Sequence, residues 1–144
     1  MKFRFLKDKN EYITILKNID KMFPIALSDK ISLESLAEKT ICNGNVLCCY
    51  IDGDFAGQIA FYCNDLETKE GYFSTLAVLP QFQGRGIAKA LLKEAVEECR
   101  KSGMKTVRLY THSNNATAIK MYNSFGFKEK TSDRDGDIKF ILEI

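Results

Sequence analysis

The sequence lacks any apolar stretch near the roughly 20 residues that a helix needs to cross a bilayer. Its first residues include basic ones but no apolar segment typical of a signal peptide, so we expect a cytoplasmic protein without a membrane partner. Charge of one sign is not in excess either. The net charge of +2 is too small to indicate nucleic acid as a partner, although it leaves room for an anionic cofactor held locally.

Residues that typically hold metals are also scarce. The five cysteines are odd in number and show no CxxC spacing, which argues against a disulfide framework or a zinc site. His112 is the only histidine, and the run Asp133–Asp137 lacks the glutamate that closes a calcium loop, so we expect a turn there and no metal site. Cys48 and Cys49 are adjacent in an apolar run, so they are predicted as core residues on opposite faces of a strand.

Hydrophobic periodicity and turn residues divide the chain into helices and strands. Helices are predicted over Asp8–Asp20, from a cap at Ser32 onward, over Gly86–Ser102 and over Asn115–Phe125. Strands are predicted over Lys2–Leu6, Val46–Ile51, Phe55–Cys63, Glu70–Leu79, Thr106–Thr111, Phe127–Lys130 and Asp137–Ile144. This order predicts one α+β domain over residues 1–144, with a mixed, mostly antiparallel central sheet flanked by helices.

The junction between the fourth predicted strand and the following helix has the pattern of a phosphate-binding turn. Pro80 ends the strand because it has no N–H for the ladder, and Gly84 and Gly86 then precede an amphipathic helix. Small residues let the backbone approach a ligand, and the free N–H groups of a helix's first turn favour an anion. Arg85 and Lys89 add positive charge nearby.

Two nucleotide-binding motifs do not fit this turn. A dinucleotide-binding GxGxxG requires a third glycine where Lys89 stands, and the pattern GxxxxGK[ST] is absent. A purely structural tight turn stays open. The residues of the turn alone therefore indicate an anion site and no particular ligand.

The same segment resembles the acetyl-CoA motif of the GNAT superfamily of N-acetyltransferases, Q/R-x-x-G-x-G/A. Gln81-Phe82-Gln83-Gly84-Arg85-Gly86 matches this motif, and so does the segment Gln83–Ala88 in a register shifted by two. The family's preceding strand splays at a bulge, and Leu76–Pro80 is similar to its end. The resemblance implies acetyl-CoA as co-substrate, with candidate contacts at Leu76, Ala77, Val78, Gln83, Gly84, Arg85, Gly86, Ile87, Ala88, Lys89 and Asn115.

A second block supports the resemblance. Residues 115–127 are similar to the family's N-x-x-A-x-x-x-Y-x-x-x-G-F pattern, in which Tyr122 takes the place of the usual general acid. A phenol has an ordinary pKa of about 10, so it can donate a proton to a thiolate at neutral pH. The alternative for Tyr122 is a ring that only packs on the sheet, and Asn115 can also serve simply as a helix cap.

The general base is less evident. Because side chains alternate along a strand, Glu70, Tyr72, Ser74 and Leu76 are expected on one face. Histone-type members of the family carry a glutamate at the position that aligns with Tyr72, so this sequence departs from them. Glu70 is the candidate base, acting through a water. The alternative is that Glu70 is a solvated residue of a polar run and that water alone accepts the proton of the acceptor amine.

We expect the acceptor to be a primary amine of a small molecule that attacks acetyl-CoA directly, because no cysteine stands where a covalent relay needs one. Ribosomal-protein N-terminal acetyltransferases carry a glutamate at the position that aligns with Tyr110, and this mismatch favours the small molecule. Acetylation of a protein N-terminus or lysine stays open, as do a non-catalytic acyl-CoA sensor and an unrelated structural domain. His112 is expected to be exposed or to face the acceptor, and the final strands could mediate a homodimer.

Overall fold

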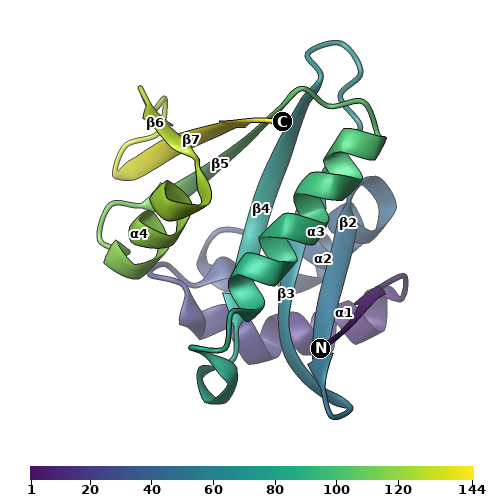
Figure 1. Cartoon of the computed structure of the whole chain (residues 1–144). Helices are drawn as coiled ribbons and strands as arrows, with labels where there is room; N and C mark the ends of the chain where they lie inside the picture. The colour runs from purple at the N-terminus through teal and green to yellow at the C-terminus, as the bar shows by residue number, and fades with distance from the viewer.

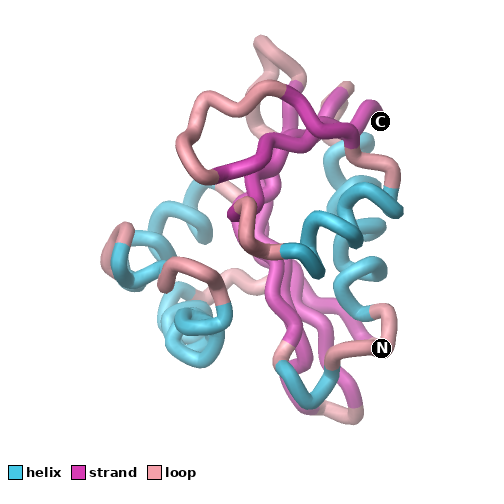
Figure 2. The backbone as a smooth tube through the Cα atoms, turned by 90° about the vertical axis from the view of Figure 1, so that its left-hand side faces the viewer, coloured by secondary structure: helices cyan, strands magenta, loops and turns pink.

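The computed structural model describes residues 1–144 and contains a seven-stranded sheet with helices on both faces (Figures 1 and 2). The strands are β1 (Lys2–Phe5), β2 (Asn45–Ile51), β3 (Asp54–Tyr62), β4 (Glu70–Val78), β5 (Thr106–His112), β6 (Lys128–Lys130) and β7 (Asp137–Glu143). The α-helices are α1 (Lys9–Ile19), α2 (Leu33–Asn43), α3 (Ile87–Lys101) and α4 (Ala116–Phe125). Short 3-10 turns cover Asp20–Met22, Leu27–Asp29 and Pro80–Phe82.

The strand order is β1-β2-β3-β4-β5-β7-β6. Only β4 and β5 run parallel, and every other neighbouring pair is antiparallel. The α+β architecture, the order of the elements and the mostly antiparallel mixed sheet are therefore confirmed. No helix combines the length and the apolar character that crossing a membrane requires.

Helix ends lie where the sequence provides caps. The side chains of Asp8, Ser32 and Asn115 each accept a hydrogen bond from a backbone N–H in the first turn of α1, α2 and α4. Gly126 ends α4 at φ 117°, in the left-handed region where a side chain would be strained. These local signals explain why the predicted helix boundaries are confirmed to within a residue or two at these ends.

The sheet separates two apolar cores. One core lies under α3 and α4 and includes Cys49 and Phe61, whereas the other lies under α1 and α2 and includes Cys48. Both cysteines are fully buried, and because each belongs to a different core, the prediction that they occupy opposite faces of one strand is confirmed. Since successive side chains alternate between the faces, central strands such as β2 and β3 contribute residues to both cores.

A β-bulge in β4 corrects one expectation. Ala60 pairs with Thr75 and Phe61 pairs with Phe73, so Ser74 is an extra residue without a partner. Such an extra residue reverses the alternation beyond it. Leu76 consequently packs with the core under α3, on the same side as Phe73, and not on the face of Tyr72. The expected common face for Glu70, Tyr72, Ser74 and Leu76 was therefore wrong.

A buried hydrogen-bond chain fixes the strand next to this bulge. The Tyr12 hydroxyl of α1 donates to Gln58 Oε1 of β3 at 3.2 Å, and Gln58 Nε2 donates to Thr75 Oγ1 of β4 at 3.2 Å. Tyr12 and Gln58 are fully buried. Because buried amides are costly to leave unpaired, this chain holds α1, β3 and β4 in one arrangement.

Replacing Tyr12 with Phe should therefore lower the free energy of unfolding by about 1–3 kcal/mol, because Gln58 Oε1 would stay buried without a donor. The matched control is Tyr50→Phe, whose hydroxyl accepts only from the exposed Arg4 and whose loss should change stability by less than about 0.5 kcal/mol. Urea titration of both variants measures the difference. Equal stability of the two variants would contradict the proposed contribution of the buried hydrogen bonds to the free energy of unfolding.

Candidate active site

The sheet opens between its two parallel strands. β4 and β5 pair only from Glu70↔Thr106 to Phe73↔Leu109, although both strands continue beyond these residues. Figure 1 shows the strands diverging toward the end of the sheet where α3 and α4 begin. The β5-facing backbone edge of the segment 74–78 therefore has no strand partner. Apart from the Val78 carbonyl oxygen, which accepts from the Gln83 side chain, its polar groups are available to a ligand.

The glycine turn lies at this open end. Gly84 has φ 80° and Gly86 has φ 78°, so both occupy the left-handed region, and a Cβ on either would meet no atom within 4 Å. The backbone N–H groups from Gly84 to Lys89 donate to no carbonyl oxygen of the chain. With the positive end of the α3 dipole behind them, these six donors form a site suited to an anion.

Side chains around the turn complete this site. The Gln83 side chain donates to the Val78 carbonyl oxygen at 3.0 Å, which ties the turn to the end of β4. Lys89 lines the cavity next to the turn and has no carboxylate within ion-pair distance. Arg85 instead stacks its guanidinium 5.4 Å from the centre of the Phe82 ring and does not line the cavity.

One cavity of about 960 Å³ joins the turn, the open edge of β4, the end of β5 and the start of α4. Of the residues predicted to contact the cofactor, all except Arg85 line it: Leu76, Ala77, Val78, Gln83, Gly84, Gly86, Ile87, Ala88, Lys89 and Asn115. His112 lines it as well, and its Nδ1 accepts from the Asn114 backbone N–H at 3.1 Å. The structure thus gathers around one space residues that lie some 40 positions apart in sequence.

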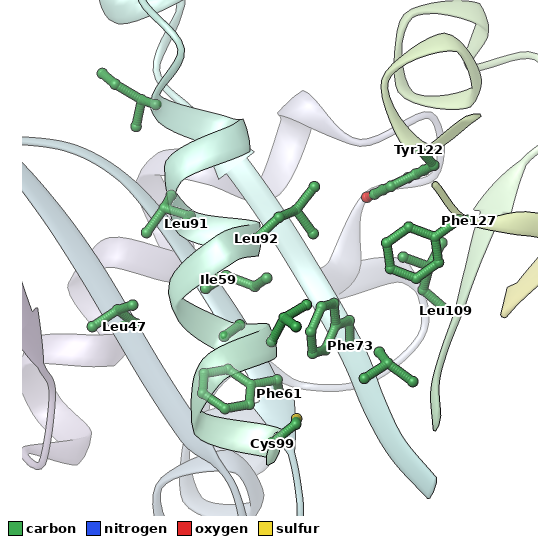
Figure 3. Packing of buried hydrophobic residues seen from close by; sticks show 14 of the residues in the cluster. Leu47, Ile59, Phe61, Phe73, Leu91, Leu92, Cys99, Leu109, Tyr122 and Phe127 are labelled. Atoms are coloured by element: carbon green, nitrogen blue, oxygen red, sulfur yellow. The ribbon is translucent and has the colours of Figure 1, made fainter. Parts of the chain in front are cut away.

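Tyr122 lines the same cavity from α4. Its ring packs 5.6 Å from Phe127 and 5.8 Å from Phe140, measured between ring centres, and only 8% of the residue is exposed. Its hydroxyl has no hydrogen-bond partner in the protein, and Figure 3 shows the oxygen pointing toward Leu92 of α3. Burial raises the pKa of this phenol above its ordinary value, because the charged form loses its hydration. The group is therefore a protonated donor with a free hydroxyl.

Glu70 lies apart from these residues. Its carboxylate forms an ion pair with Arg108 Nη1 at 3.0 Å, at the paired end of β4, and it does not line the cavity. About 30% of each of the two side chains is exposed. The candidate base is thus already engaged by a cation outside the space that Tyr122 faces.

Sequence reasoning missed several residues that line the cavity from the face of α1 and α2. They include Tyr72, Tyr110 and Arg134, together with residues of the segment between α1 and α2. Tyr72 and Tyr110 were noted only as departures from other proteins, and Arg134 falls in a loop read as a turn. No local sequence pattern predicts that these three residues lie close together, because their proximity depends on the pairing of strands far apart in sequence.

Known proteins resemble this chain in both sequence and fold. The acetyltransferase (GNAT) family model matches residues 14–127. An uncharacterized N-acetyltransferase of Methanocaldococcus jannaschii is 36% identical over 86 residues, which cover 57% of this chain and 38% of that protein. The [ribosomal protein bS18]-alanine N-acetyltransferase of Escherichia coli is 36% identical over 76 residues, which cover 53% of this chain and 51% of that protein. The matched segment thus spans about half or less of these relatives.

A solved structure shares the fold over its full length. The PaiA N-acetyltransferase of Thermoplasma acidophilum, solved in complex with coenzyme A, superposes with a TM-score of 0.80 at 21% identity and covers all of both chains. At this identity the likeness concerns the fold, while the family model covers most of the chain and both sequence motifs. The chain belongs to the acetyltransferase (GNAT) family, for which acetyl-CoA is the typical co-substrate.

Proposed function

We propose that this protein transfers the acetyl group of acetyl-CoA to a primary amine of a small molecule by direct attack. The observation that carries the proposal is the single cavity that joins the anion-binding turn, the unpaired edge of β4 and the hydroxyl of Tyr122. These three parts supply what the reaction needs: a place for the pyrophosphate, a track for the pantetheine arm and a proton donor for the leaving thiolate.

In this proposal the free N–H groups of Gly84–Lys89 bind the pyrophosphate, and the Lys89 ammonium neutralises part of its charge. The backbone of Leu76 and Val78 binds the pantetheine arm along the open edge of β4. Asn115, which caps α4 through its side chain, contacts the cofactor with its remaining polar groups. Arg85 is the weakest of the proposed contacts, because its guanidinium rests on Phe82.

The reaction replaces the carbon–sulfur bond of the thioester with a carbon–nitrogen bond and moves one proton from the amine to the departing sulfur by way of water and Tyr122. The neutral amine nitrogen attacks the thioester carbonyl carbon, the carbon–sulfur bond breaks as the tetrahedral intermediate collapses, and the thiolate takes the proton of the Tyr122 hydroxyl. We infer that water accepts the proton lost by the amine, since Glu70 is held by Arg108 outside the cavity, and that water returns a proton to the Tyr122 phenolate. If Glu70 serves as the base, it acts through an intervening water chain.

The main alternative is acetylation of a protein or peptide, which the E. coli relative favours because it is a ribosomal-protein alanine N-acetyltransferase. A non-catalytic acyl-CoA sensor is the alternative of another class. A screen of amino acids, amino sugars, aminoglycosides, polyamines and peptides, read by thiol release from acetyl-CoA, separates the three. Turnover with peptides only would support the first alternative, and cofactor binding without any thiol release would support the second.

We also propose a cytoplasmic location and leave a homodimer through the final strands as a hypothesis. All five cysteines are free, as is typical of a reducing compartment. In β7, the buried Phe140 faces the core, and β6 covers one edge of the strand. The short β6 is the edge through which a second subunit could pair.

Gly86→Asp should weaken the binding of CoA, because a side chain and a negative charge would enter the anion site. Gly86→Asn is the matched control: it has nearly the same size and tolerates a positive φ, but it carries no charge. Calorimetric titration with CoA should give at least about a tenfold weaker affinity for Asp than for Asn, as expected when like charges meet near a helix start. Equal affinities of the two variants would contradict the position assigned to the pyrophosphate.

Tyr122→Phe should leave CoA affinity and the melting temperature nearly unchanged, because the ring that packs on Phe127 and Phe140 stays. Its turnover should fall by about a hundredfold if thiolate departure limits the rate, since general acid catalysis typically contributes this much. Steady-state rates together with CoA titration measure both effects. An unchanged rate in the variant would remove Tyr122 from the mechanism.

The pH dependence follows from the same hydroxyl. Because burial raises the pKa of Tyr122, the phenol keeps its proton up to and beyond about pH 10, the ordinary value for tyrosine. The rate should therefore rise with pH as the acceptor amine loses its proton, with no decline caused by Tyr122 below about pH 10. An alkaline decline that is present in the native protein and absent from Tyr122→Phe would show that the phenol ionises earlier.

A further inference from the structure

The face of the sheet opposite α3 and α4 carries a row of three tyrosines. Tyr62 stacks on Tyr72 with ring centres 6.2 Å apart, and Tyr72 meets Tyr110 edge-on at 6.4 Å. The Tyr62 hydroxyl lies 3.3 Å from Thr40 Oγ1 of α2, which identifies this as the face of α1 and α2. Tyr72 and Tyr110 also line the cavity, so the cavity reaches this face through the opening between β4 and β5.

Two arginines stack on this row, and they differ in their partners. The Arg108 guanidinium lies 4.5 Å from the centre of the Tyr72 ring and is neutralised by Glu70. The Arg134 guanidinium lies 3.8 Å from the centre of the Tyr110 ring and has no carboxylate within 4.0 Å. Arg134 thus presents a cation that is positioned by an aromatic ring and available to a ligand in the cavity.

The loop that carries Arg134 is held in place by its own hydrogen bonds. The Ser132 hydroxyl accepts from the Arg134 N–H and donates to the Arg134 carbonyl oxygen, both at 3.1 Å. The Tyr110 hydroxyl donates to Asp133 Oδ1 at 2.7 Å, so this carboxylate is already bonded next to Arg134. The backbone at Arg134 is therefore held by the two residues that precede it, and the guanidinium stacks on the Tyr110 ring.

The charges that line the cavity on this face are mostly positive. Lys30, Lys39 and Arg134 line it and take part in no ion pair, whereas Asp137 is the one carboxylate in the lining. Such a surface attracts an anionic group and opposes a molecule with several positive charges.

We propose that the acceptor is an amine that also carries a carboxylate, as amino acids do, and that Arg134 binds this carboxylate. The inference rests on the proposed acetyl transfer and names its substrate class. A guanidinium matches a carboxylate with two parallel N–H···O bonds, and the ring of Tyr110 behind it restricts its orientation. Because polyamines and aminoglycosides carry several positive charges, the mostly positive lining of the cavity makes them poor acceptors.

The first test compares free amino acids with their amides in the native protein, read by thiol release from acetyl-CoA. The amide has the more easily deprotonated amine, so intrinsic reactivity favours it. A KM at least about tenfold lower for the acid, against that trend, supports the carboxylate site. Equal or better use of the amide, or of a polyamine, overturns it while leaving acetyl transfer intact, whereas no thiol release from any amine removes the proposed function itself.

The second test uses three variants with one acid and its amide. Arg134→Gln should raise the KM for the acid by about tenfold or more, with a much smaller change in kcat and no change for the amide. Arg134→Lys keeps the charge and should recover part of the affinity. The control Arg100→Gln makes the same chemical change at an exposed residue of α3, outside the cavity, and should behave as the native protein.

These variants also separate recognition from folding. Arg134 is exposed, so neither substitution should alter the melting temperature or the affinity for CoA. An unchanged KM for the acid in Arg134→Gln, with CoA affinity preserved, would assign the loop no role in acceptor recognition. Equal losses for the acid and the amide would show a general distortion of the cavity and would equally contradict a carboxylate site at Arg134.

Discussion

The structure depends on a sheet that stops pairing halfway along its two central strands. β4 and β5 share only four residue pairs, and beyond Phe73 and Leu109 each strand continues with one edge unbonded. Unpaired backbone groups are costly inside a protein, so such an opening persists only where a ligand or solvent satisfies them. The same opening lets one cavity contact both faces of the sheet, which a continuous sheet would keep apart.

The elements around the opening explain why it does not close. The extra residue Ser74 turns β4, and the chain from Tyr12 through Gln58 to Thr75 fixes the strand beyond this bulge to α1. A bulge increases the local twist and can end pairing, so it accounts for the divergence of β4 from β5. Buried hydrogen bonds on the side of α1 and α2 thus set the position of β4, while the unpaired backbone groups of this strand face the opening toward β5.

The sequence indicated the proposed cofactor side of the cavity through a local pattern and left the proposed acceptor side largely unmarked, and the reason is physical. A pyrophosphate is bound by successive backbone N–H groups, so Gly84, Gly86 and the helix after them form a local pattern that one short segment reveals. The helix caps and the order of strands are local in the same sense. The bulge at Ser74 leaves no comparable signal, because it is defined only by pairing with β3, and the expected face of Leu76 was wrong for that reason. The ion pair of Glu70 depends likewise on the register between β4 and β5.

The proposed recognition of the acceptor has the opposite character, because it depends on side chains from distant segments. Tyr72, Tyr110 and Arg134 come from two strands and a late loop, and only the parallel pairing of β4 with β5 brings the two rings together. A backbone site tolerates change in most side chains, whereas a side-chain site can change its ligand through one substitution. Family members can therefore retain one cofactor turn and differ in acceptor. In this chain the guanidinium over Tyr110, which forms no ion pair, is the feature on which the proposed carboxylate-bearing acceptor rests.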